Sequence, residues 1–103
     1  MHRIHLHSFT GGLLDYQRWV RRHPQSIFGI SLATTEAQAT WDFGKLADIR
    51  KLVLETDTPY MTGSHASALA VQAEWLATHR GIPRWAVLGY TAHTTAIFYG
   101  LPV

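Results

Sequence analysis

The alternation of short apolar runs with amphipathic segments is the strongest constraint on this chain, because it recurs three times within only 103 residues. The apolar runs have the length and pattern of β-strands, and the segments after them carry apolar residues at helical spacing. The predicted strands are 3–9, 26–33 and 51–57, and the predicted helices follow Gly12, begin at Thr35, follow Ser64 and follow Pro83. The order β-α-β-α-β-α-α predicts an α/β fold with parallel strands and right-handed crossovers.

Local signals refine the helices. Thr35-Glu36-Ala37-Gln38 has the form of a capping box, which places a helix start at Thr35 and directs the helix toward Phe43-Gly44. All four tryptophans fall within predicted helices, where we expect them to pack against the sheet. They are Trp19, Trp41, Trp75 and Trp85.

A three-stranded parallel sheet is incomplete by itself, because two edges and much of an apolar face stay uncovered. Hydrophobic residues make up 47% of the chain, which excludes a disordered protein. Charged residues make up 16%, against about 25% in typical proteins, so little charge is present to solvate the exterior. We therefore expect an ordered unit that is part of something larger, with an exposed sheet edge that favours self-association.

Several protein classes are excluded by composition. The absence of cysteine excludes a disulfide scaffold, a cysteine-ligated zinc site and thiol catalysis. No apolar run is long enough to span a membrane, and residues 1–5 lack the apolar stretch of a signal peptide, so we expect an intracellular protein, cytoplasmic or nuclear. The net charge is +2, and the basic cluster of Arg18, Arg21 and Arg22 is interpreted as a solvated helix face.

Polar side chains gather where the predicted strands end, which is the edge at which α/β folds bind ligands. His5 and His7 lie on the same side of the first strand, a spacing that either chelates a divalent metal or belongs to ordinary polar histidines. Glu55 and Asp57 share a face at the end of the third strand, where they hold a metal or accept a proton from water. The alternative is that Asp57 caps the next turn and Glu55 pairs with an arginine. The spacing groups none of the later histidines with Asp57, namely His65, His79 and His93.

Two segments are distinctive. Residues 6–11 read Leu-His-Ser-Phe-Thr-Gly, and residues 54–60 read Leu-Glu-Thr-Asp-Thr-Pro-Tyr. They resemble the H-C-F-[ST]-G and L-E-T-D-x-P-Y stretches of the TatD family of metal-dependent deoxyribonucleases. Residues 91–101 also resemble that family's closing helix, T-x-x-N-A-x-x-L-F-G-L. The resemblance covers essentially the whole chain.

The resemblance implies a (β/α)8 barrel hydrolase, a nuclease that cuts phosphodiester bonds in DNA or, in some members, RNA. It implies a divalent metal ion (Mg, Mn or Zn) with His7 as a ligand at the end of barrel strand six. It also implies that Asp57, at the end of strand eight, binds metal and orients or deprotonates the attacking water. The resemblance assigns no ligand role to His5.

The chain also departs from the family pattern. A complete barrel needs about 250 residues, so we expect a partial TIM barrel formed by the last three β/α units. Residues 1–103 would then be a C-terminal fragment of a TatD-type hydrolase domain. The family's first-strand His-x-His, its mid-barrel Glu and its fifth-strand His have no counterpart here. The loop after Tyr60 is reduced to 61–65, and Thr94 replaces the closing-helix Asn, which affects substrate binding rather than the fold.

Three functions are compatible with these observations. The chain is the carboxyl-terminal part of a nuclease, a non-catalytic relic or interaction module, or a fragment that self-associates into a closed sheet. Catalytic metals usually have at least three protein ligands, and the resemblance supplies only His7 and Asp57. We therefore expect little or no nuclease activity from the isolated chain.

Overall fold

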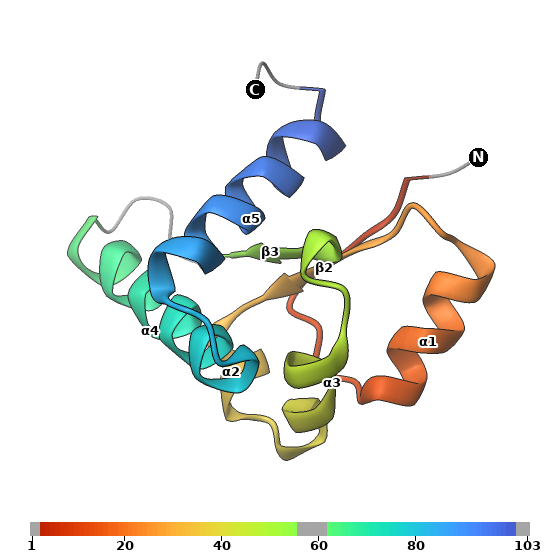
Figure 1. The fold of residues 1–103 in the computed structure, drawn as a ribbon, viewed down its shortest axis with the longest axis horizontal. Coiled ribbons are helices and arrows are strands. Elements are labelled where there is room, and N and C mark those ends of the chain that lie inside the picture. Colours follow the sequence, from red (N-terminus) through yellow and green to blue (C-terminus); the bar gives the residue numbers. More distant parts are fainter. Residues whose placement is uncertain (1–2, 56–61, 101–103) are drawn as a thin grey trace.

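The structure is a computed structural model that describes residues 3–55 and 62–100, with residues 62–67 described as helix backbone only. Its sheet has three parallel strands in chain order (Figure 1). These strands are β1 (His5–Leu6), β2 (Ile27–Ile30) and β3 (Leu52–Leu54). The predicted mixed α/β fold and the parallel pairing are confirmed.

The strands are shorter than predicted because turns interrupt the apolar runs. The first strand, β1, is only two residues long. Ser8, two residues after its end, has a φ of 50°, a left-handed conformation that cannot continue a strand. Ser31 begins a helix directly after β2, and a 3-10 turn, η2 (Ile49–Lys51), directly precedes β3. The position predicted as the end of the third strand, Asp57, lies outside the described residues.

Helices follow each strand. They are α1 (Leu13–Arg22) after β1, α2 (Leu32–Glu36) and α3 (Trp41–Leu46) after β2, and α4 (Thr62–Arg80) and α5 (Arg84–Phe98) after β3, with a 3-10 turn, η1 (Gln38–Thr40), between α2 and α3. No helix among the described residues is long and apolar enough to cross a membrane.

The predicted helix start at Thr35 is wrong. The hydroxyl of Ser31 accepts a hydrogen bond from the backbone N–H of Thr34 at 3.3 Å, and the Ser31 N–H donates to the Thr34 hydroxyl at 3.0 Å. This reciprocal pair caps α2 at Ser31 instead. Ala37 is extended (φ −81°, ψ 126°), so the single helix predicted to run to Gly44 is divided into α2 and α3.

One face of the sheet carries the main core. Phe28, Ile30 and Leu52 are fully buried on this face. The rings of Tyr16 on α1 and Phe43 on α3 pack on Phe28 with centroid distances of 4.9 Å and 5.9 Å. Removing these large apolar surfaces from water is the main stabilising contribution to such a fold.

The opposite face is covered by α5, so the expectation that an apolar face stays uncovered is wrong. Figure 1 shows α5 running across the sheet. The Thr94 hydroxyl donates to the backbone oxygen of Arg50 just before β3 at 3.0 Å, and Arg3, just before β1, donates to the Phe98 oxygen at 3.1 Å. Val53 is 2% exposed as a result.

Three of the four tryptophans do not pack as predicted. Trp19, Trp41 and Trp85 are 38%, 63% and 76% exposed. Trp75 packs against the core, and its ring lies where a Cβ on Gly44 would stand, 2.4 Å from Cη2.

Candidate metal centre

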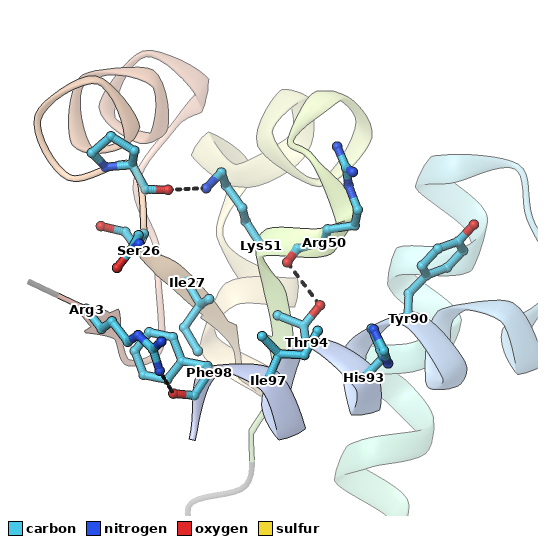
Figure 2. Close-up of a pocket in the computed structure, with 12 residues that line it drawn as sticks. Arg3, Ser26, Ile27, Arg50, Lys51, Tyr90, His93, Thr94, Ile97 and Phe98 are labelled. Atoms are coloured by element: carbon cyan, nitrogen blue, oxygen red, sulfur yellow. Dashed lines mark hydrogen bonds between the residues drawn. The ribbon is translucent and has the colours of Figure 1, made fainter. Parts of the chain in front are cut away.

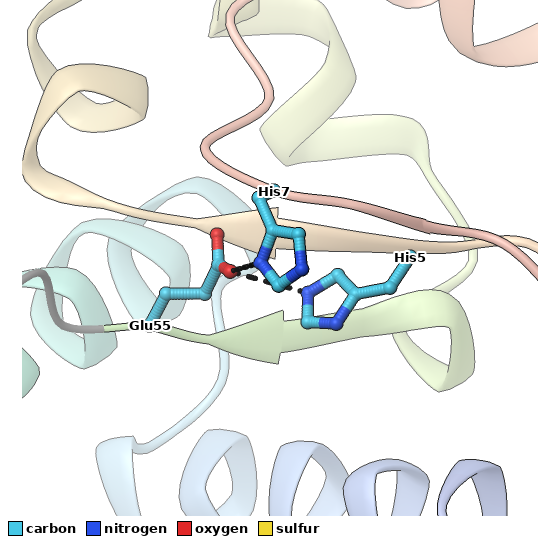
Figure 3. A group of neighbouring side chains, drawn as sticks. All are labelled: His5, His7 and Glu55. Atoms are coloured by element: carbon cyan, nitrogen blue, oxygen red, sulfur yellow. Dashed lines mark hydrogen bonds and ion pairs between the residues drawn. The ribbon is translucent and has the colours of Figure 1, made fainter.

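Three side chains converge on one face of the sheet: His7 and Glu55 meet toward its carboxyl end, and His5, level with Ile27, reaches them along the same face (Figure 3). His5 lies on β1, His7 follows β1, and Glu55 follows β3. Each offers one ligand atom, and these atoms all lie within 4.8 Å of one another. The two imidazole rings are stacked, with centroids 3.8 Å apart and planes inclined by 26°.

Glu55 reaches the histidines by crossing β2. Because β2 separates β3 from β1, and neighbouring strands lie about 4.8 Å apart, the side chain of Glu55 has to pass over the middle strand. Gly29 stands at that crossing point. A Cβ at Gly29 would lie 1.8 Å from Oε1 of Glu55, so only glycine leaves the path open.

Both oxygens of Glu55 are held by residues that follow β1. Oε2 accepts a hydrogen bond from Nδ1 of His7 at 2.5 Å, and Oε1 accepts one from the backbone N–H of Ser8 at 2.5 Å. The left-handed conformation of Ser8 belongs to the turn that presents this N–H, and its hydroxyl is fixed by Ser31 at 2.6 Å. Uncommon backbone conformations of this kind are concentrated at functional sites.

The backbone of Glu55 is held by a buried amide from α4. The side chain of Gln72, 1% exposed, accepts a hydrogen bond from the Glu55 N–H at 3.0 Å and donates one to the Glu55 carbonyl oxygen. This reciprocal pair fixes the chain where β3 ends. Gln72 is therefore a positioning residue for Glu55.

Among the described residues, one ring nitrogen of His5 makes no hydrogen bond. Its Nδ1 lies 2.6 Å from the hydroxyl of Tyr99, whereas its buried Nε2 makes no hydrogen bond within the described chain although Oε2 of Glu55 is 3.2 Å away. When Nδ1 carries the proton and donates to Tyr99, the Nε2 lone pair faces a carboxylate. Two such electron pairs face one another favourably only with a cation between them, and metal-bound histidines commonly donate their other ring N–H in this way.

Burial lowers the pKa of His5, and the neighbouring His7 lowers it further. The imidazole is therefore neutral at a pH where an exposed histidine, with a pKa of about 6.5, starts to take up a proton. Without protons on the two imidazoles, the three side chains carry one net negative charge. Their nitrogen and oxygen donors, the free Nε2 and this charge together fit a divalent metal ion.

The lowered pKa predicts a pH-dependent stability. The unfolded chain binds the His5 proton more tightly than the folded chain, so the contribution of His5 to stability is complete above pH ~6.5 and is lost as the pH falls through the lowered pKa. We expect the free energy of unfolding of the metal-free protein, measured with urea, to decrease as the pH falls from about 7 to about 5. His5→Asn is expected to flatten this decrease, and an unchanged slope would assign the effect to another group.

The residues predicted from sequence lie in different places relative to this cluster. His7 lies in the cluster, while Asp57 lies outside the described residues. Glu55 was weighed as half of a carboxylate pair or as an arginine partner, and in the described structure it contacts the two histidines. His5, which the family resemblance left without a role, is also a member. The His-x-His spacing was the signal for His5, whereas no sequence signal identified Gln72.

The model of the family described as TatD related DNase matches residues 1–99, which is essentially the whole chain. No curated protein matches the sequence significantly. The match includes every residue of the cluster described above and its supporting residues on α4 and after α5.

Proposed function

Because the chain belongs to the TatD-related DNase family, we propose that it contributes to a metal-dependent nuclease that hydrolyses phosphodiester bonds in DNA, or in RNA. The observation that supports this proposal best is the convergence of His5, His7 and Glu55 on one face of the sheet. Asp57 is proposed as a further ligand and as the group that orients or deprotonates the attacking water. It follows Glu55 by two positions in the L-E-T-D-x-P-Y signature.

The donor set favours some metals over others. Two imidazoles and a carboxylate suit Zn²⁺ or Mn²⁺ better than Mg²⁺, which prefers oxygen ligands and keeps much of its water. A bound divalent ion would supply activation of water and neutralisation of charge on the phosphoryl oxygens. His7, whose side chain is 70% exposed, lies at the open side of the cluster, and His5 and Glu55, at 12% and 13%, form its inner side.

The proposed architecture is that of the last three β/α units of a barrel. Three consecutive parallel strands in chain order, each followed by a helix, support it, and α5, which here covers the other face of the sheet, would have to leave that face in a closed barrel. The remaining strands and ligands would come from sequence beyond these residues or from association at the exposed edges of β1 and β3. The alternative, a non-catalytic interaction module, has no need for a bound metal.

Metal binding and complementation test this proposal. Since the structure groups three donors, the metal-free chain is expected to bind Zn²⁺ or Mn²⁺ by itself, as measured by calorimetry. Cleavage of single-stranded DNA by the chain alone is expected to be negligible. Co-expression with the first five β/α units of a TatD-related DNase is expected to give metal-dependent cleavage that Asp57→Asn abolishes.

The possible outcomes separate the alternatives. A chain that folds but binds neither metal favours the interaction module. Cleavage by the isolated chain that is lost in Asp57→Asn supports the nuclease and corrects the partial-barrel architecture. Complemented cleavage that survives Asp57→Asn contradicts the role proposed for Asp57.

A further inference from the structure

A second candidate site lies where the three strands begin, beside α5 (Figure 2). It is a pocket of about 380 Å³ between α5 and the segments that lead into the three strands. Arg3 precedes β1, Ser26 directly precedes β2, and Lys51 directly precedes β3, so the parallel order of the strands places all three at one edge. The volume is within the range of small-molecule sites.

Two cations of this pocket have no carboxylate partner in the described chain. Arg3 donates one hydrogen bond to the Phe98 carbonyl oxygen at 3.1 Å, and the Lys51 ammonium donates one to the Pro24 carbonyl oxygen. Both retain further donors, because a guanidinium has five N–H groups and an ammonium has three. Arg50, the third cation of the lining, is paired with Asp48 by two hydrogen bonds of 3.1 Å.

Ser26 provides an independent observation. It is fully buried, it lines the pocket, and its hydroxyl finds no hydrogen-bond partner anywhere in the described structure. Buried hydroxyls are nearly always paired, so an unpaired one indicates a missing partner. Figure 2 shows Ser26 between the segments that carry Arg3 and Lys51. An oxygen-rich anion would give a partner to the hydroxyl and to both cations once the long side chains of Arg3 and Lys51 turn from the Phe98 and Pro24 carbonyls and the Ser26 side chain rotates toward the pocket.

Most of the exposed surface of the pocket is apolar, although Gln25, His93 and Thr94 also line it. Ile27 on β2 and Ile97 and Phe98 on α5 border the same pocket. An inorganic ion would leave this surface exposed to water, whereas a ligand with an apolar body would cover it. Two cations and a hydroxyl also match a dianion with three free oxygens better than a carboxylate with two.

We propose that the pocket at the amino-terminal ends of the strands binds an organic phosphate monoester, with its phosphate between Arg3, Ser26 and Lys51. The ester's apolar group lies against Ile97 and Phe98. This site shares no residue with the metal centre, although the two adjoin, since His5 pairs with Ile27 in the sheet and its ring lies 6.1 Å from that of Phe98.

Titration with phenyl phosphate in the presence of EDTA tests the proposal, with amide chemical shifts of the ¹⁵N-labelled chain as the readout. The largest shifts are expected at Ser26, Ile27 and Lys51. Arg3→Gln and Lys51→Gln are each expected to weaken binding about tenfold. Ser26→Ala is expected to weaken it several-fold without lowering the temperature of unfolding, because the hydroxyl has no partner in the described chain.

Controls separate a built site from general attraction and from the metal centre. Arg22→Gln removes one exposed positive charge from α1 and is expected to leave binding unchanged, as is Glu55→Gln. Inorganic phosphate is expected to bind more weakly than phenyl phosphate. The proposal is overturned when phenyl phosphate shifts no amide near Ser26, or when Arg22→Gln weakens binding as much as Arg3→Gln. If Lys51→Gln does not fold, binding of phenyl phosphate to Arg3→Gln alone tests the proposal.

Discussion

Replacing Glu55 with glutamine is expected to lower the affinity for Zn²⁺ or Mn²⁺ by about 100-fold or more. The substitution keeps the size of the side chain but removes the carboxylate from the cluster of His5, His7 and Glu55. Loss of residues that merely support a metal ligand already costs about 10- to 100-fold in affinity. Calorimetric titration of the metal-free protein measures the change, and the amide spectrum shows that the fold is kept.

Glu74→Gln is the matched control. Glu74 lies on α4, is exposed, and pairs with Arg84 at 3.6 Å, so the same chemical change occurs away from the cluster. We expect its metal affinity to equal that of the unmodified chain. Equal affinities for Glu55→Gln and Glu74→Gln would contradict a metal centre at Glu55.

Gly29→Ala is expected to weaken metal binding strongly without altering any ligand. The added methyl group would lie 1.8 Å from Oε1 of Glu55 and 2.1 Å from Cδ, so the side chain must leave its path across β2. The carboxylate then loses His7 and the Ser8 N–H. The affinity should fall as far as in Glu55→Gln, and the free energy of unfolding should fall by about 1–3 kcal/mol through the lost hydrogen bonds and the crowding.

Gly89→Ala controls for the change of residue type. A Cβ at Gly89, inside α5, meets no atom within 4 Å, so this substitution should raise stability by about 0.5–1 kcal/mol and leave metal affinity unchanged. Calorimetry and urea unfolding are applied to both variants. Normal metal affinity in Gly29→Ala would show that Glu55 does not need the path over Gly29.

The fold was predictable from sequence where the signal was periodic. Alternating apolar runs and helical stripes were sufficient for the three parallel strands and for α1, α4 and α5, since burial of a repeating face decides these elements. Boundaries were predicted less well. The helix start moved from Thr35 to Ser31 because two sequences with capping potential compete, and only the position of β2 decides between them.

The candidate site was predictable in part, because short motifs and the strand period identify some of its residues. His7 and the Glu55-Thr56-Asp57 segment stand in recognisable motifs, and the side-chain period of two placed His5 beside His7. The reciprocal hydrogen bonds of Gln72 and the open path over Gly29 depend on the packing of α4 and on strand order. Neither leaves a pattern in the sequence.

The sequence by itself determined the type of each element, the family and the residues at the strand ends, because these follow from local periodicity and short motifs. Only the tertiary structure decided which strand-end residues meet. Glu55 contacts His5 and His7 across β2 because the strands are ordered β1-β2-β3 and the middle strand carries glycine at the crossing. Likewise, Arg3, Ser26 and Lys51 share a pocket because parallel strands start at the same edge, a relation between residues that are distant in the chain.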